Sequence, residues 1–143
     1  MKLTVTSREV SEELTSQDRL NVGGVKAGAS AISKCYEVHI VNNNTKPLLF
    51  KKMTVKWYQE EMTFESPYAI LPYDGITKSF GLFFKDENDL ESTDAGIITG
   101  KGEILLQFVD DKVVNVEYKV DINYDNYSID GIKVTIDDID INE

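Results

Sequence analysis

The chain has 143 residues, a length that suits one domain and is short for two. Hydrophobic residues make up 41% and charged residues 28% of it, the balance of a soluble globular protein with a core. Twenty-five acidic against fifteen basic side chains leave a formal charge of −10, which disfavours nucleic acid as a partner and anionic membranes as a binding surface. The sequence has no apolar run of membrane-spanning length and no apolar region of a secretory signal near its start. We therefore expect a cytoplasmic product, or one released without a leader.

Residues 1–34 differ in character from the rest of the chain. Lys2–Thr6 predicts an edge strand, and the spacing of Thr6 and Glu9 matches a capping box that would begin a short helix. Because few apolar positions follow, we expect this segment to be weakly helical or extended. Residues 22–31 are mostly small, which indicates a connector. The alternative is a segment that changes conformation or inserts at a membrane.

From residue 35 onward, apolar and polar side chains alternate with a period of two, the pattern of strands with one buried face. Asp110-Asp111, between two such stretches, predicts a tight hairpin turn. The sequence therefore predicts an all-β protein, with a single antiparallel β-sandwich (or barrel) over residues 35–143. The alternating stretches are residues 36–41, 52–58, 80–84, 104–108, 114–120 and 132–136.

Charge is distributed unevenly along the chain. Through Phe64 there are nine basic and seven acidic residues, and from Glu65 onward there are six basic and eighteen acidic residues. The acidic segment Asp137–Glu143 is expected to form a frayed, solvated tail. Four lysines lie close together in the first half, and on a shared exposed face they would form a cationic patch: Lys46, Lys51, Lys52 and Lys56.

The sequence offers no catalytic constellation. Cys35 and His39 would lie on one face of a strand but about 13 Å apart, too far for a nucleophile and its base. Asp121, Asn123 and Asp125 match the first half of an EF-hand loop, but the glycine and the closing glutamate of that loop are missing. We therefore expect no enzymatic activity, no cofactor and no metal site, with a weak surface calcium site at these three residues as the alternative.

Several aromatic residues stand apart from the alternation, at strand ends or in predicted turns. A ring with a polar tip suits a boundary between apolar and wet surroundings, such as lipid headgroups or sugars. Ordinary tyrosines that anchor their own loops are the alternative. These residues are Trp57, Tyr58, Tyr68, Tyr73, Tyr124 and Tyr127.

Five short motifs follow one another in a recognisable order. They are the strand and Asn-rich turn of Glu37–Thr45, the strand end Lys56–Tyr58, the segment Ser66–Pro72, the hairpin start Thr99–Leu105 and the turn Tyr124–Ser128. Over roughly residues 36–136, this order resembles two groups of small β-sandwich membrane-binding toxins, the actinoporin-like cytolysins and the aegerolysins, which include insecticidal bacterial members.

The resemblance implies a protein that binds a phospho-headgroup lipid through loop aromatics. Actinoporin-like members then insert an N-terminal helix to form a pore, whereas aegerolysins usually recruit a larger pore-forming partner. By likeness, Tyr124, Tyr127 and Ser128 match the headgroup-binding tyrosine cluster, and Trp57 matches the aegerolysin tryptophan. A lysine could supply the donor that a phosphate needs. The candidate headgroup-binding residues are therefore Trp57, Tyr58, Lys119, Tyr124, Tyr127 and Ser128.

Two functions of different classes follow from these observations. The first is a lipid-headgroup-binding, toxin-like protein that lies on a membrane surface and forms pores by oligomerising or with a second protein component. Its acidic charge would make binding depend on a specific headgroup rather than on electrostatic capture. The alternative is a non-lytic acidic interaction module that binds a protein or a sugar, of the inhibitor or immunity type.

Overall fold

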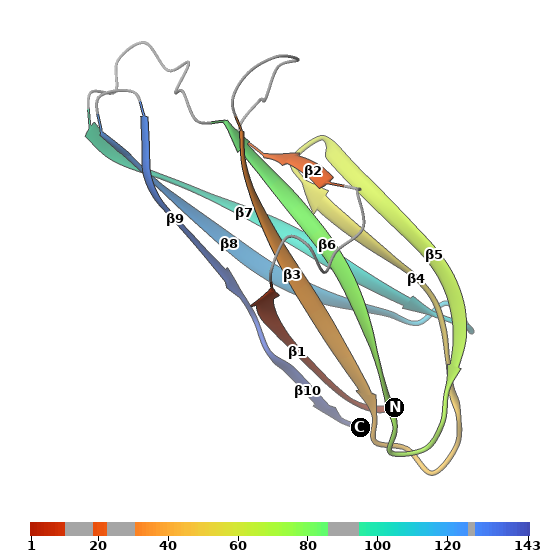
Figure 1. Ribbon diagram of the computed structural model, residues 1–143. Helices are drawn as coiled ribbons and strands as arrows, with labels where there is room; N and C mark the ends of the chain where they lie inside the picture. The colour runs from red at the N-terminus through yellow and green to blue at the C-terminus, as the bar shows by residue number, and fades with distance from the viewer. Residues whose placement is uncertain (11–18, 23–30, 86–94, 126–127) are drawn as a thin grey trace.

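The computed structural model describes residues 1–10, 19–22, 31–85, 95–125 and 128–143 of the chain. For residues 19–22, 31–33, 83–85, 95–98, 124–125 and 128–130 it describes the backbone alone. All described elements are β-strands, and they form two sheets packed face to face (Figure 1). The predicted all-β sandwich is therefore confirmed. None of the described segments forms a helix with the length and apolar character that crossing a bilayer requires.

Each sheet has five strands. Sheet A has the order β10-β1-β3-β6-β2, and sheet B has the order β5-β4-β7-β8-β9. Neighbouring strands are antiparallel except β2 and β6, which pair in parallel. The strands of sheet A are β1 (Lys2–Val10), β2 (Arg19–Val22), β3 (Ala31–Asn42), β6 (Gly75–Lys85) and β10 (Ile139–Asn142). Those of sheet B are β4 (Leu48–Trp57), β5 (Glu60–Ile70), β7 (Ala95–Phe108), β8 (Val113–Asp125) and β9 (Ser128–Ile136).

The core lies between the sheets and consists of the side chains whose alternation predicted it. On β8, every second side chain from Val114 to Ile122 is buried, and its neighbours face the solvent. Since burying apolar surface contributes roughly 25 cal/mol per Å², this alternation fixes which face of each strand turns inward. The six predicted stretches lie within β3, β4, β6, β7, β8 and β9, apart from Tyr58, which follows β4 in a turn.

The predicted turn at Asp110-Asp111 is confirmed. Both residues have left-handed backbones, with φ of 72° and 57°, and the Phe108 N–H donates to the Lys112 carbonyl over 2.8 Å. This hydrogen bond closes a short hairpin loop over residues 109–111, and aspartate tolerates the left-handed conformation better than most residues do.

The N-terminal segment corrects two expectations. Thr6 and Glu9 lie inside β1, where they pair with His39 and Tyr36 of β3, so the predicted helix start at Thr6 is wrong. Residues Lys2–Thr6 are also not an edge strand, because β10 pairs along the other side of β1. The predicted small-residue connector falls largely on residues 23–30, outside the described residues.

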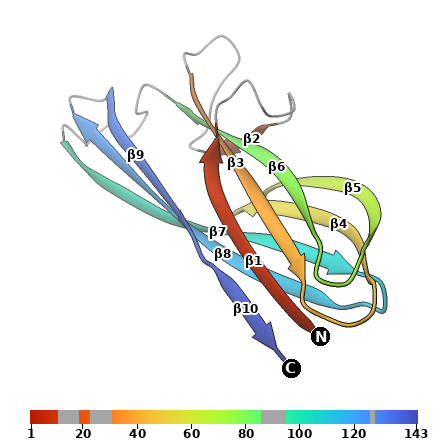
Figure 2. The same ribbon diagram turned by 60° about the horizontal axis from the view of Figure 1, so that its bottom comes forward.

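The acidic C-terminus is not a frayed tail. Its residues Ile139–Asn142 form β10, the edge strand of sheet A. Ile139 and Ile141 pack against the core, while Asp140 accepts a hydrogen bond from the Thr4 hydroxyl over 3.3 Å. The strand therefore forms because its apolar residues alternate with its acids. Figure 2 shows the chain crossing from β9 of sheet B to β10 of sheet A.

A strand that the alternation did not predict, β5, forms the edge of sheet B. Met62 and Phe64 alternate on it, but Pro67 obscures the pattern because proline lacks the N–H that a strand ladder needs. The structure accommodates Pro67 at a register shift, where two residues of β5 lie opposite one of β4. An edge strand with a bulge is the place in a sheet where proline costs least.

Asn42, at the end of β3, joins two turns at one end of the sandwich. Its side chain is completely buried, and its amide Nδ2 donates to the carbonyls of Lys46 over 2.9 Å and Ile70 over 2.8 Å. Its Oδ1 accepts from the backbone N–H of Asn44 over 2.9 Å. The backbone of Asn42 bonds to Tyr73 and Asp74 of the next turn. One side chain thus fixes the turn after β3 against the turn before β6.

We expect Asn42→Ala to lower the free energy of unfolding by about 2–4 kcal/mol. The substitution leaves two carbonyl groups without their buried donor, and each costs roughly 1–3 kcal/mol. Asn43→Ala is the matched control, since Asn43 makes one side-chain hydrogen bond, to Thr4, and is only half-buried. Urea unfolding of both variants checks this, and equal losses would contradict the role assigned to Asn42.

Candidate functional site

The structure spreads the predicted headgroup-binding residues over different parts of sheet B. Trp57 ends β4, and Tyr58 follows it in a two-residue hairpin loop, with φ of 51° and 74% of its surface exposed. Lys119 lies in the middle of β8. Because its neighbour Tyr118 is buried in the core and adjacent strand residues point to opposite faces, Lys119 points outward, on the other face of the sheet from Trp57.

The remaining predicted residues lie further along the sheet. Tyr124 belongs to the end of β8 and Ser128 begins β9, while Tyr127 lies outside the described residues. Gly100, the neighbour of Trp57, pairs with Val120, and Tyr124 is four residues beyond, or roughly 13 Å along the strand. Figure 1 shows the ends of β8 and β9 at a different corner of the molecule from the β4–β5 hairpin. The described residues of this set therefore do not form one site.

Trp57 instead belongs to an aromatic cluster at the β4–β5 hairpin. Its ring stacks on Tyr118 at 6.0 Å between centroids and meets Tyr58 edge to face at 5.0 Å. A Cβ atom on Gly100 would lie 2.3 Å from the Trp57 ring, so the ring needs a residue without a side chain there. The Tyr118 hydroxyl donates to the Lys56 carbonyl over 2.7 Å, and burial raises the pKa of Tyr118. These contacts make Trp57 an anchor for the hairpin.

The four clustered lysines do not share one patch. Lys52 and Lys56 lie on the outer face of sheet B, where the register places Glu65 opposite Lys52 and glutamates on both sides of Lys56. Lys46 lies in the turn after β3, at the end of the sandwich. The lysines of the sheet face are thus interleaved with acids, and Lys46 belongs to a different surface.

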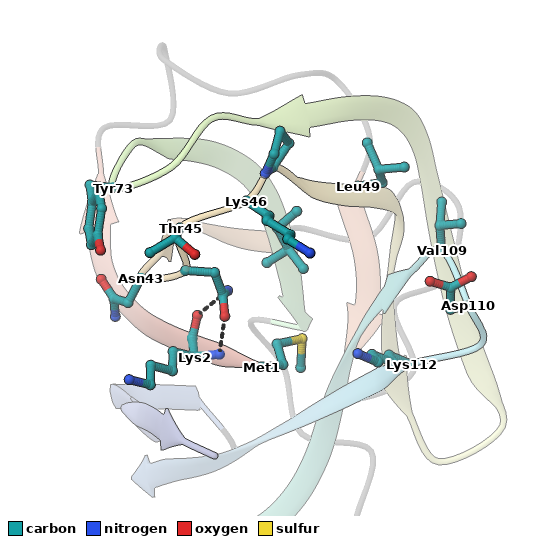
Figure 3. Close-up of a pocket in the computed structure, with 13 residues that line it drawn as sticks. Met1, Lys2, Asn43, Thr45, Lys46, Leu49, Tyr73, Val109, Asp110 and Lys112 are labelled. Atoms are coloured by element: carbon teal, nitrogen blue, oxygen red, sulfur yellow. Dashed lines mark hydrogen bonds between the residues drawn. The ribbon is translucent and has the colours of Figure 1, made fainter.

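That end of the sandwich carries a groove of about 490 Å³. Three turns meet there, at residues 43–47, 71–74 and 109–112, and they close around Met1 and Leu48. Figure 3 shows Lys46 and Lys112 extending toward the open centre of the groove, with Asp110 on its wall. The volume falls in the range of small-molecule sites. We call this end of the molecule, with its groove, the basal surface.

The basal surface also gathers exposed apolar side chains. Of the seven large hydrophobic side chains that are exposed among those described, six lie at this end and only Tyr58 lies elsewhere. Single exposed apolar residues are common, whereas groups mark interaction surfaces, so the three that share the groove, Leu49, Tyr73 and Val109, are the informative ones. The six residues are Leu49, Tyr68, Leu71, Tyr73, Val109 and Val113.

Sequence reasoning found part of this surface. Tyr68 and Tyr73 were among the predicted loop aromatics, but Leu49 and Val109 were not singled out. Each is an apolar residue directly beside a buried one, at Leu49-Phe50 and Phe108-Val109. Two adjacent apolar residues at a strand end cannot both face the core, and this break in the alternation is the signal that could have identified them.

Cys35 and His39, the nucleophile and base considered from the sequence, differ in their surroundings. Cys35 is buried, whereas His39 is exposed and lies 3.1 Å from the Thr77 hydroxyl through its Nδ1. No group of three potential metal-ligating side chains occurs in the described part of the chain. Comparison of the sequence with models of protein families gives no match, and comparison with curated proteins gives none either.

Gly100→Ala should displace Trp57. The added methyl group overlaps the indole ring, and relieving such a clash costs roughly 1–3 kcal/mol of stability. Since Trp57 is the single tryptophan, its fluorescence spectrum reports the displacement directly. Gly131→Ala is the matched control, because a Cβ at Gly131 meets nothing within 4 Å. An unchanged spectrum and stability in Gly100→Ala would rule out this packing.

Stability should fall as pH rises above 10. The unfolded chain ionises tyrosine at its ordinary pKa of about 10, whereas burial raises the pKa of Tyr118 in the folded protein. The unfolded state therefore releases a proton first, and folding loses about 1.4 kcal/mol per pH unit above 10 for this group. Between pH 9 and 11, the free energy of unfolding measured in urea should fall less in Tyr118→Phe than in the parent protein. Equal falls in both proteins would exclude Tyr118 as a source of the pH dependence.

Proposed function

We propose that this protein binds the interface of a zwitterionic lipid membrane through its basal surface. The observation that carries the proposal is a groove that combines three exposed apolar or aromatic side chains, Leu49, Tyr73 and Val109, with the lysines Lys46 and Lys112. Apolar side chains partition into the boundary between headgroups and acyl chains, and tyrosine rings favour the same depth. The β-sandwich scaffold would hold these side chains on tight turns at one end.

The charges of the groove support a phosphate as the recognised group. Lys46 and Lys112 extend toward its centre (Figure 3), and lysine is a common donor to phosphate oxygens. Asp110 on the wall offers a carboxylate to the cationic end of a headgroup such as phosphocholine. Because the chain as a whole carries −10, an anionic bilayer would repel it, and a neutral bilayer of zwitterionic lipid is the better match.

The proposal agrees with the resemblance to small membrane-binding toxins in function but differs in the residues. The resemblance points to Trp57 and the Tyr124–Ser128 turn, and the sequence adds Tyr58 and Lys119, whereas the exposed apolar side chains and the groove lie at the basal surface. The two sets are far enough apart to be tested separately. Pore formation, alone or with a second protein component, would be a further step after binding.

We expect the protein to co-sediment with vesicles of sphingomyelin and phosphatidylcholine. Leu49 and Val109 are about half exposed in the free protein, so burying each in the membrane interface should contribute about 1 kcal/mol to binding. The double variant Leu49→Ser with Val109→Ser should therefore bind roughly 10–30-fold more weakly. Lys46→Gln with Lys112→Gln should weaken binding to the same vesicles and more strongly at low salt. Dye release from the vesicles, measured in parallel, reports whether binding leads to a pore.

Tyr58→Ser and Lys119→Gln serve as matched controls, because they alter exposed residues outside the basal surface. Binding that survives in these controls and falls in the basal variants supports the proposal. Binding that falls only in the controls would assign the headgroup site to the residues of the resemblance. No binding to vesicles of these lipids, or of ceramide phosphoethanolamine, would overturn lipid binding and favour the alternative, an acidic module that binds a protein or a sugar.

A further inference from the structure

β10 covers only half of the outer edge of β1. Its register runs from Lys2 opposite Asn142 to Val5 opposite Ile139, whereas β1 continues to Val10. In the described part of the chain, no strand pairs with the outer edge of Thr6–Val10. Five residues of an extended strand therefore present an open edge directly in line with β10.

The backbone of Ser7 and Glu9 faces this open edge. The Lys2 carbonyl accepts a hydrogen bond from the Asn43 N–H, on the β3 side of β1. Backbone groups of successive strand residues point to opposite sides, so those of even-numbered residues in β1 point to β3 and those of odd-numbered residues point to β10. Beyond Val5 the odd-numbered residues are Ser7 and Glu9, and their donors and acceptors suit an added strand.

A slot of about 430 Å³ lies beneath the open edge, between the two sheets. Ser7, Glu9, Lys34 and Tyr36 line it from sheet A, and residues 132–136 of β9 line it from sheet B. Ile132, Val134 and Ile136 are half-buried and pack against the core. The side chains of an added strand that point inward would therefore meet these three apolar side chains on the β9 side and the polar groups of Ser7, Glu9 and Lys34 on the other.

Tyr36 is the buried polar group of the slot. The residue is 4% exposed, and its hydroxyl forms no hydrogen bond with another residue that the structure describes. Burial and the neighbouring Glu9 carboxylate raise the pKa of Tyr36, so the hydroxyl keeps its proton and, among the described residues, is a donor without an acceptor. Buried donors normally have partners, and a ligand in the slot would supply one.

Basic residues outnumber acidic ones in the lining of the slot, and two of the three basic residues form ion pairs with acids. Three basic residues and one acidic residue line it, although the whole protein carries −10. The segment that already pairs with β1 shows what this edge accepts, since β10 alternates isoleucine with acidic or polar residues and its isoleucines face the core. Lys34 bonds to Glu9 at 3.4 Å and Arg8 to Glu37 at 2.9 Å, while Lys133 lies on the β9 side.

We propose that the open edge of β1 and the slot beneath it bind an extended, acidic segment of a partner protein. The segment pairs with Thr6–Val10 as an additional strand in line with β10. Its apolar side chains point into the slot against β9, and an acidic side chain pairs with Lys133, the basic lining residue that forms no ion pair with another described residue. This mode of recognition gives affinity through the main chain and selectivity through alternate side chains. It is independent of the basal surface and of lipid binding.

The test uses the full chain and a labelled, terminally blocked peptide of alternating aspartate and isoleucine, six residues long. We expect saturable binding by fluorescence anisotropy and slower hydrogen exchange of the Ser7 and Glu9 amides in the complex. The same peptide with lysine in place of aspartate should bind at least tenfold more weakly. Binding of both peptides alike, or binding without protection of these amides, would overturn the proposal.

Two variants locate the site. Ser7→Pro removes an outward N–H, which an edge strand tolerates, and should weaken binding about fivefold, the value of one hydrogen bond. Tyr36→Phe should weaken binding to a similar extent without lowering the free energy of unfolding, because its hydroxyl has no partner in the described part of the free protein. Tyr58→Phe, which alters an exposed hydroxyl elsewhere, is the matched control. If Ser7→Pro fails to fold, Tyr36→Phe decides: unchanged affinity for the peptide in that variant overturns the proposal.

Discussion

A single buried amide joins the turns on which the basal surface is built. Asn42 continues the inward face of β3, after Val38 and Ile40, but replaces an apolar side chain with one that donates and accepts hydrogen bonds. It can do so because turn carbonyls converge on it where the strand ladder ends, and a buried amide is stable only when its groups are paired. The positions of the surrounding turns, and therefore of the groove that they enclose, depend on this contact.

The alternation of apolar and polar residues was enough to predict the sandwich, because burial of one face decides the register of each central strand. It missed two edge strands, β5 and β10, although it found the edge strand β9. In β5, Pro67 interrupts the pattern at a bulge, and in β10 the acids conceal the alternation of Ile139 and Ile141. Edge strands often carry charges or proline that discourage aggregation, and in these two strands such residues hide the composition that identifies a strand.

The candidate site was harder to predict than the fold, since it depends on which turns meet in space. The Asn-rich turn, the turn at Tyr73 and the hairpin at Asp110-Asp111 were each visible in the sequence, but nothing local to any of them shows that they enclose one groove. Conversely, the predicted headgroup site combines Trp57, assigned by family likeness, with Lys119, assigned as a phosphate donor. Strand periodicity alone places residue 57 on the inner face of the sheet, with Val55, and residue 119 on the outer face, because its neighbour Val120 points inward. The two side chains therefore lie on different faces of the sheet.

The fold places the unevenly distributed charges of the chain on different surfaces. Acids in the second half of the sequence would repel one another on a single surface, yet β10 places its acids on an edge beside β1, within reach of the Thr4 hydroxyl. Next to β10, basic residues are in the majority in the lining of the slot between β1 and β9. At the basal surface, lysines project into the groove. A strongly acidic protein can thus present two locally basic recesses. The net charge acts at long range and limits which partners approach, whereas the charges of the recesses act at short range and select among those that do. The net charge and the local charge therefore need not predict the same ligand.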